Sequence, residues 1–290
     1  MLMRTLLICP GERTTVPALS AQLPLAHVPV LGQTLLEYWL SALAIQSVKD
    51  IGVLSHTRQD LTSELVGAGE RWGINARVID ESRELTPAEA LLKYTTELEN
   101  APAADSIIVL DHFPGRPELP LFASYKNWFA GMRQWIPSAM TVDRVGTNEV
   151  QAGVWVGCHS HVSPQAILRP PCWIGQHVFI GERAIIGPGA VVEDGSFVEP
   201  GAELAESWIG PDTFVGQFAR IDASLAWANT LVNWETGSAA HIADRFLLCA
   251  LRQPRGQRTL GWLAKLSDIY NRNKGEVGML WKQLLLHKEG

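Results

Sequence analysis

An aliphatic residue recurs at every sixth position through much of the second half of the chain. The residues in register are Val156, Val162, Leu168, Ile174, Ile180, Ile186, Val192, Val198 and Leu204. The frame then slips by one residue and continues with Ile209, Val215 and Ile221. A small residue usually stands two positions before each aliphatic residue, and glycine often follows it. This period predicts a parallel β-helix, in which each six-residue unit supplies one short strand and one corner.

The residue immediately before each interior aliphatic residue is predicted to point outward, and these residues fall into three columns. The columns read Trp155, Trp173, Val191, Trp208, then His161, Phe179, Phe197, Phe214, and finally Ile167, Ile185, Glu203, Arg220. Aromatic side chains are common in exposed strands, but two aromatic stripes oppose solubility because each ring buries ~150–250 Å² when covered. We therefore expect the aromatic columns to be a contact surface, covered by the first half of the chain, by the C-terminal tail or by another subunit.

The first half of the chain alternates between apolar strand patterns and amphipathic helix patterns. Strands are predicted over residues 3–9, 51–54, 76–79 and 106–110, and helices over residues 32–46, 59–65 and 87–98. Such alternation predicts a parallel α/β sheet. We expect an α/β domain over residues 1–150, the β-helix over residues 151–245 and a helical basic tail over residues 246–290.

Composition and charge narrow the class of protein. The 290 residues are 47% hydrophobic and carry a formal net charge of −6, which fits neither a disordered chain nor a nucleic-acid-binding protein. The four cysteines are scattered, so we expect no metal site and no disulfide framework. The apolar run before Pro10 is too short for a signal peptide, and no stretch approaches the ~18–20 apolar residues of a membrane span. A cytoplasmic protein is expected.

The C-terminal tail is basic, whereas the rest of the chain is acidic. Residues 255–290 hold seven Lys or Arg and three Asp or Glu residues, a net charge of +4. Apolar residues follow at helical spacing from Trp262 to Tyr270 and again from Met279 to Leu285. A basic amphipathic helix binds a membrane surface or a partner protein. The alternative interpretation is a helix that packs on the open end of the β-helix.

Several motifs resemble one known family. The stretches V-W-V-G-C-H-S-H-V-S-P-Q-A-I (154–167) and I-G-P-G-A-V-V-E-D-G (186–195) resemble the left-handed β-helix of sugar-1-phosphate nucleotidyltransferases. In the first half, P-V-L-G-Q-T-L-L-E-Y-W-L (29–40) and G-A-G-E-R-W-G-I-N-A-R-V-I-D-E (67–81) are similar to segments of nucleotide-sugar pyrophosphorylases. The resemblance implies a truncated Rossmann-like nucleotidyltransferase domain followed by a left-handed parallel β-helix.

The first catalytic loop of that family is altered here. The family has G-x-G-T-R, whose amides and arginine cradle a triphosphate. The equivalent run is C-P-G-E-R-T-T, residues 9–15. Pro10 and Glu12 replace the two glycines, so an amide donor is lost and a negative charge is added where phosphates bind. Gly11 and Arg13, each shifted from the family position, are the vestigial nucleotide loop.

The other positions implied by the family are also changed. The lysine-proline pair falls on Leu25 and Ala26, and the base-binding G-T-A-G becomes T-P-A-E at residues 86–89. The metal-binding Gly-Asp pair becomes Asp111-His112, where Asp111 could bind a cation if the register slips by one residue. Only some forty residues separate Leu110 from the β-helix, where the family places its sugar pocket and second metal carboxylate. An active pyrophosphorylase is therefore not expected.

The resemblance leads to the expectation of a non-catalytic binding, regulatory or assembly subunit in sugar-nucleotide or surface-polysaccharide metabolism. We expect no cofactor, a homo-oligomer or hetero-complex formed through the outer face of the β-helix, and a sugar-phosphate or nucleotide as ligand. One alternative is an active, Mg²⁺-dependent sugar-1-phosphate nucleotidyltransferase that uses Arg13 and Asp111. A second is a hexapeptide-repeat sugar acyltransferase with His161 as general base.

Overall fold

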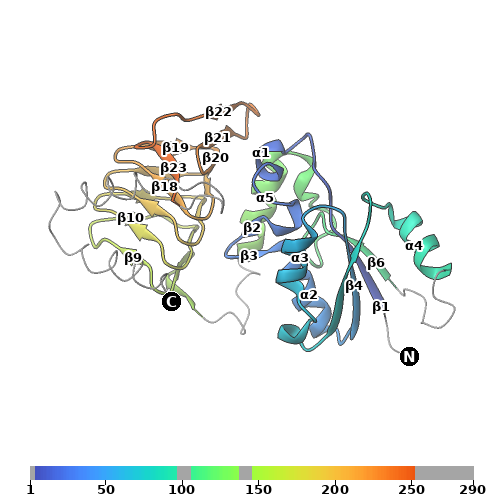
Figure 1. Ribbon diagram of the computed structural model, residues 1–290. Coiled ribbons are helices and arrows are strands. Elements are labelled where there is room, and N and C mark those ends of the chain that lie inside the picture. Colours follow the sequence, from blue (N-terminus) through green and yellow to red (C-terminus); the bar gives the residue numbers. More distant parts are fainter. Residues whose placement is uncertain (1–3, 97–105, 137–145, 252–290) are drawn as a thin grey trace, which may run out of the picture. The chain divides into compact units, whose positions relative to one another are not determined.

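The first half of the chain forms a four-stranded parallel sheet in the order β5-β4-β1-β6 (Figure 1). Its strands are β1 (Arg4–Ile8), β4 (Asp50–Ser55), β5 (Asn75–Asp80) and β6 (Ser106–Val109). The computed structural model describes residues 4–96, 106–136 and 146–251, which all lie in one compact unit, Met1–Leu251. The predicted parallel α/β sheet is confirmed.

Helices cover both faces of this sheet (Figure 1). They are α1 (Pro17–Ser20), α2 (Leu35–Ile45), α3 (Gln59–Val66), α4 (Pro87–Thr96) and α5 (Tyr125–Trp135), with short 3-10 turns at η1 (Leu25–His27), η2 (Glu70–Trp72) and η3 (Leu121–Ala123). Successive residues of a strand point to opposite faces, so Leu7 of β1 packs in the core beneath α2, whereas Leu6 and Ile8 pack beneath α4.

Helix α2 begins three residues later than predicted. Residues 29–34 form a small hairpin of β2 (Pro29–Val30) and β3 (Gln33–Thr34). Thr34 then caps the helix, because its hydroxyl accepts the Glu37 N–H while the Glu37 carboxylate accepts the Thr34 N–H. The turn of this hairpin lies at Leu31 and Gly32.

The second half of the chain is a stack of short parallel strands that form three sheets. The strands are β8 (Val154–Gly157), β9 (His161–Val162), β10 (Ile167–Leu168), β11 (Cys172–Ile174), β12 (Phe179–Ile180), β13 (Ile185–Ile186), β14 (Ala190–Val192), β15 (Phe197–Val198), β16 (Glu203–Ala205), β17 (Trp208–Ile209), β18 (Thr213–Val215), β19 (Arg220–Asp222) and β20 (Ser224–Trp227). The aliphatic residues of the repeat form its interior. The pairing follows the repeat through the slip, since Ile186 pairs with Leu204 and Val192 with Ile209. The predicted β-helix is confirmed.

Antiparallel strands flank the stack at both ends. Strand β7 (Thr147–Gln151) precedes it, and β21 (Thr230–Asn233) and β22 (Ala239–His241) extend the same sheet beyond β20. Strand β23 (Leu248–Ala250) pairs antiparallel with β18. The expected helical tail therefore begins with a strand, because the β18 edge offers main-chain partners to residues 248–250. The rest of the expected tail, from residue 252, lies outside the described residues.

The first outward column of the β-helix consists of Trp155, Trp173, Val191 and Trp208 and is called the tryptophan column. It is covered by the α/β domain. Trp173 and Trp208 are 1% and 0% exposed and belong to the same hydrophobic core as helices α2 and α5. The ring of Trp128 in α5 meets Trp208 edge-on at 6.2 Å between centroids. Within the described residues, the first half of the chain, one of the three covers that the sequence left open, is in contact with this column.

The second aromatic column is a continuous stack of rings. Centroids are 5.3 Å apart between His161 and Phe179, 4.3 Å between Phe179 and Phe197, and 5.9 Å between Phe197 and Phe214. Phe214 is buried, whereas Phe179 is half-buried. In the third column, Glu203 lies 3.8 Å from Arg220, as expected for a solvated face.

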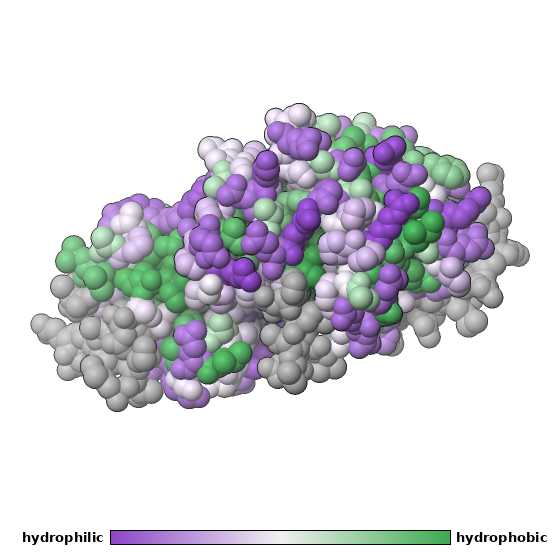
Figure 2. Space-filling model, turned by 180° about the vertical axis from the view of Figure 1, so that it is seen from behind, coloured by the Kyte–Doolittle hydropathy of each residue, from purple (hydrophilic) through white to green (hydrophobic). Residues whose placement is uncertain are grey.

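The outer surface is mixed in character. Figure 2 shows a face on which apolar side chains reach the surface in separate patches between hydrophilic ones. Large apolar side chains exposed in the described ranges include Ile45, Phe218 and Phe246. No helix among the described residues is long and apolar enough to cross a membrane.

Candidate functional site

The loop that follows β1 holds a carboxylate at the position where the sequence predicts a vestigial phosphate cradle. The Gly11 N–H donates to Oε2 of Glu84 at 2.9 Å. The Arg13 guanidinium donates to both oxygens of the same carboxylate, at 2.7 Å and 2.6 Å. Glu84 lies in the segment between β5 and α4, so a distant part of the chain supplies the anion. Gly11 and Arg13 thus form an anion site, and Glu84 fills it.

The Arg13–Glu84 pair is partly shielded from water. The side chains are 34% and 26% exposed. Burial by itself raises the pKa of Glu84, but hydrogen bonds from Arg13 and from the Gly11 N–H outweigh burial and lower this pKa. The pKa of Arg13 is raised, first by its hydrogen bond to Glu84. A bidentate arginine–carboxylate pair of this kind is among the stronger polar contacts in proteins.

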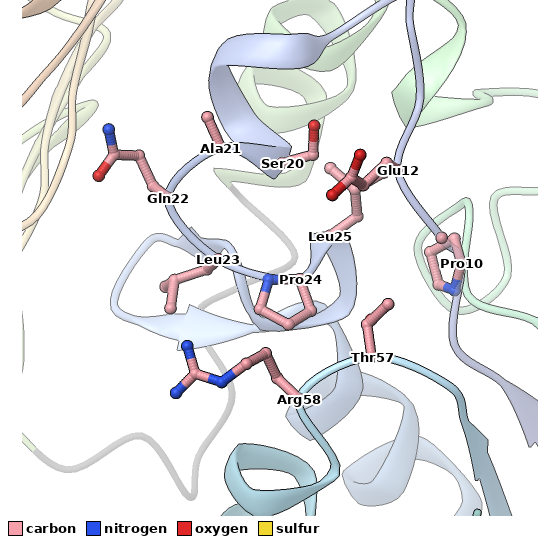
Figure 3. Close-up of a pocket in the computed structure, with 11 residues that line it drawn as sticks. Pro10, Glu12, Ser20, Ala21, Gln22, Leu23, Pro24, Leu25, Thr57 and Arg58 are labelled. Atoms are coloured by element: carbon pink, nitrogen blue, oxygen red, sulfur yellow. The ribbon is translucent and has the colours of Figure 1, made fainter. Parts of the chain in front are cut away.

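Space around the cradle is limited. A Cβ atom at Gly11 would lie 2.9 Å from Nε2 of His56 and 3.1 Å from Oε2 of Glu84, so a larger residue at this position would require these side chains to shift. Beside the cradle lies a pocket of about 140 Å³, and its lining includes Glu12, Ser20, Leu25, Thr57 and Arg58 (Figure 3).

Arg58, which lines that pocket, forms an ion pair with Asp60. Figure 3 shows the Arg58 side chain extending from the start of α3 toward Leu23 and Pro24. Its guanidinium lies 3.0 Å from Oδ2 of Asp60. The pocket therefore offers no unpaired guanidinium from Arg58 to a phosphate.

Asp111 lies after β6, at the same end of the sheet as the cradle. Its charge acts on Arg13, because the two residues follow neighbouring parallel strands. Oδ1 of Asp111 is 2.6 Å from Nδ1 of His112, and the carbonyl of His112 accepts the indole N–H of Trp39 at 2.8 Å. The structure thus brings Gly11, Arg13 and Asp111 to one edge.

The residues at this edge do not fit the Mg²⁺ ion that the family resemblance implies for an active enzyme. Mg²⁺ is usually held by one or two carboxylates together with substrate phosphates. Here Asp111 is engaged with His112, and Glu84 holds the groups that would position the phosphates. In the described part of the chain, no group of three or more His, Cys, Asp or Glu side chains is arranged to hold a metal ion.

The remaining family positions have structural roles. Leu25 and Ala26, at the place of the lysine-proline pair, are buried in η1. At the base-binding position, Thr86 and Glu89 cap α4 through Thr86 N–H to Glu89 Oε2 and Glu89 N–H to Thr86 Oγ1. The hydrogen bond from Arg83, followed by those from Thr86, lowers the pKa of Glu89 to about 2.

His161, the candidate general base of an acyltransferase, lies on β9 of the β-helix. Its ring stacks on Phe179, and within the described residues its side chain makes no hydrogen bond. His159 and His177 stack on each other at 5.1 Å between centroids. No carboxylate among the described residues orients any of these three rings.

Sequence reasoning missed two glutamates that have central positions. Glu84 fills the anion site, and Glu193 is fully buried against the turn between β2 and β3, where it accepts the N–H groups of Leu31 and Gly32. Glu193 carries a weak signal, because it stands directly after an interior aliphatic residue, at a position where six of the twelve units have glycine. No sequence signal identifies Glu84, since it stands in an ordinary polar segment.

Two family comparisons match this chain. Residues 5–117 match the family described as nucleotidyl transferase. Residues 171–206 match the bacterial transferase hexapeptide family, described as six repeats. No curated protein matches the chain. The two matches occur in the order that the sequence motifs predict.

Proposed function

Because the chain joins a nucleotidyl transferase domain to bacterial transferase hexapeptide repeats, we propose that it is a non-catalytic relative of sugar nucleotidyltransferases. In this proposal it acts as a binding, regulatory or assembly subunit. The observation that carries the proposal is the carboxylate of Glu84, which occupies the anion site formed by Gly11 and Arg13.

Glu84 opposes triphosphate binding in two ways. It uses the backbone donor and the guanidinium that would otherwise hold phosphate oxygens, so a nucleotide must first break charge-assisted hydrogen bonds of about 1.5–3 kcal/mol each. Its negative charge, together with that of Glu12, which lines the adjacent pocket, also repels a polyphosphate. A nucleotide that binds in the adjacent pocket would therefore lack a phosphate cradle.

The transferase chemistry needs groups that this site lacks. Phosphoryl transfer depends on positioning and on stabilisation of charge by cations and metal ions. Leu25 and Ala26 stand where the family lysine-proline pair would be, and Asp111 is bound to His112. These substitutions favour the loss of catalysis over a divergent active enzyme.

The place of the protein in metabolism is inferred from the family alone. Relatives with this domain order act on sugar nucleotides, so we propose a role in sugar-nucleotide or surface-polysaccharide metabolism, with a sugar-phosphate or nucleotide as ligand. The same proposal includes assembly of subunits through Phe179 and Phe197, the half-buried phenylalanines of the second aromatic column. The basic tail is proposed to contact a partner or a membrane surface.

The decisive experiment is a pyrophosphate-release assay with each common nucleoside triphosphate, sugar-1-phosphates and Mg²⁺. The full chain should release no pyrophosphate above the rate without protein. Sustained release that is lost in the Arg13→Ala variant would overturn the proposal and establish the active nucleotidyltransferase. Binding of acyl-coenzyme A that is lost in a His161→Ala variant would instead favour the acyltransferase.

A further inference from the structure

Two histidines stand at the same corner of neighbouring coils of the β-helix. His159 lies between β8 and β9, and His177 lies between β11 and β12, one coil further along the chain. Strand β8 pairs with β11 and β9 pairs with β12, and the His177 N–H donates to the carbonyl of Cys158 at 3.2 Å. The main-chain pairing of the coils therefore holds the two histidine backbones in register.

The two histidine side chains leave this corner side by side. Both residues have a left-handed backbone, with φ angles of 58° at His159 and 55° at His177. Their rings stack with the planes 8° apart and the centroids 5.1 Å apart. Both residues are exposed, and within the described residues neither ring makes a hydrogen bond or an ion pair. The ring nitrogens of both residues are thus open to a ligand from solvent.

The column of imidazoles at this corner ends after these two residues. The equivalent position in the next coil is Gly195, whose N–H donates to the carbonyl of Gln176. Beside it, Oδ1 of Asp194 accepts the Gln176 N–H at 2.8 Å. Over the ranges that the structure describes, no third His, Cys, Asp or Glu joins the pair in a metal-binding group. The corner therefore presents two imidazoles from this chain.

We propose that His159 and His177 together bind one late first-row transition-metal ion, such as Zn²⁺ or Ni²⁺. Imidazole is a preferred ligand of these ions, whereas Mg²⁺ and Ca²⁺ prefer carboxylate and carbonyl oxygens. Scattered cysteines argue against a thiolate site but have no bearing on a pair of imidazoles. With two ligands from the chain, the other coordination positions are open to water or to a further ligand. The site lies outside the nucleotide loop and does not depend on whether the chain binds a nucleotide.

The spacing of the two rings suits one shared ion. A zinc–imidazole bond is ~2.0–2.1 Å long, so two bound nitrogens lie at most ~4.2 Å apart. Rings with centroids 5.1 Å apart reach this separation by tilting toward each other through side-chain rotation, with the backbone unmoved. Two ions bound separately, one on each ring, would repel each other as neighbouring divalent cations. Because the corners are already in register, little freedom is lost when both rings bind the same ion.

Isothermal titration calorimetry of the full chain, prepared without an affinity tag, tests the site with Zn²⁺ and Ni²⁺ at about pH 7.5. His159→Asn and His177→Asn each remove one imidazole, and asparagine tolerates the left-handed backbone of this corner. Each substitution should weaken binding about tenfold or more. The double variant should lose less affinity than the product of the two single losses, because either substitution alone already breaks the chelate. Mg²⁺ should not bind at the pair.

The matched control is His241→Asn, which removes an exposed histidine from β22 and should leave the affinity unchanged. The proposal is overturned if neither ion binds the wild type, or if either single variant of the pair binds as tightly as the wild type. It is also overturned if the pair holds two ions and each variant loses only one of them.

Should an asparagine variant fail to fold, nuclear magnetic resonance of the wild type provides the second test. Paramagnetic Ni²⁺ bound at the pair should broaden the ring signals of His159 and His177 at lower concentrations than those of His241. Equal broadening of the three rings would contradict the proposal.

Discussion

The guanidinium of Arg13 holds both carboxylate oxygens of Glu84, at 2.7 Å and 2.6 Å. This pair joins the loop after β1 to the segment before α4 and neutralises the only cation of the vestigial nucleotide loop. In the proposed function, the protein's own acid stands where the phosphates of a nucleotide would be needed.

Removal of the Glu84 charge should restore anion binding. In Glu84→Gln, Arg13 loses its ionic partner while the shape of the side chain is retained. We expect the affinity for inorganic pyrophosphate to rise about tenfold or more, which corresponds to ~1.4 kcal/mol or more. Isothermal titration calorimetry measures the change. Glu89→Gln is the matched control, because it also breaks an arginine–glutamate pair, with Arg83, but leaves Gly11 and Arg13 untouched. Equal affinity in the two variants would contradict the prediction.

Trp173 should contribute to stability far more than its neighbour in the same column. It is fully buried against the α/β domain, whereas Trp155 is only partly buried. Trp173→Ser should lower the free energy of unfolding by about 3–5 kcal/mol because a large cavity is left. Trp155→Ser should lower the free energy of unfolding by a clearly smaller amount. Urea unfolding followed by circular dichroism compares the two, and equal losses would show that the column is not covered as described.

Assembly should depend on the other aromatic column. Phe179 is half-buried in the ring stack, so Phe179→Ser removes apolar surface without opening the interior of the β-helix. We expect this variant to have a lower oligomeric mass by light scattering than the wild type. Ile167→Ser, an exposed residue of the third column, is the control. An unchanged mass in Phe179→Ser would remove this column from the proposed interface.

His27 should make the protein less stable in acid. Burial lowers the pKa of His27, and its Nε2 lies 3.0 Å from Oγ1 of Thr62. A histidine whose folded pKa lies below the unfolded value of 6.5 binds its proton more readily in the unfolded state, so stability is lost as the pH falls through that region. The free energy of unfolding of the wild type should therefore exceed that of His27→Gln by more at about pH 7.5 than at about pH 5.5. Denaturant titrations at both values measure it, and a constant difference would be the contrary result.

Gly157 and Gly115 should each resist substitution, but for different physical reasons. A Cβ at Gly157 would overlap the backbone of Gly175 and Gln176 in the next coil, although its φ is ordinary. Gly115 has a φ of +74° but open space around it. Gly157→Ala should cost about 1–3 kcal/mol or more through overpacking, and Gly115→Ala about 1 kcal/mol through its backbone conformation. Thermal unfolding compares the variants, and a smaller loss in Gly157→Ala would contradict close packing of the coils.

Much of the fold could be predicted because its signals are local. The six-residue period gives the interior of the β-helix, including the slip between Leu204 and Ile209, because each strand buries one aliphatic residue. The start of α2 was predicted too early, since the hairpin at residues 29–34 depends on the contacts of Leu31 and Gly32 with Glu193. Residues 248–250 form a strand because the β18 edge is available to them, which no local pattern reveals.

The candidate site was predicted only in outline. The sequence identifies Gly11, Arg13 and Asp111, and parallel strands bring them to one edge. It does not identify Glu84, which is 71 residues from Arg13, or the contact of Glu193 with Leu31, 162 residues away. Charged side chains carry no periodic signal, and their partners are set by how separate elements pack.

The sequence by itself determined the repeat and the order of the two families, because each is written in neighbouring residues. Only the tertiary structure decided which group pairs with Gly11 and Arg13 and what covers Trp173 and Trp208. The carboxylate of Glu84 binds Arg13, and the α/β domain covers Trp173 and Trp208. Both outcomes depend on long-range contacts, whose energies come from burial and from charges brought together after the chain has folded.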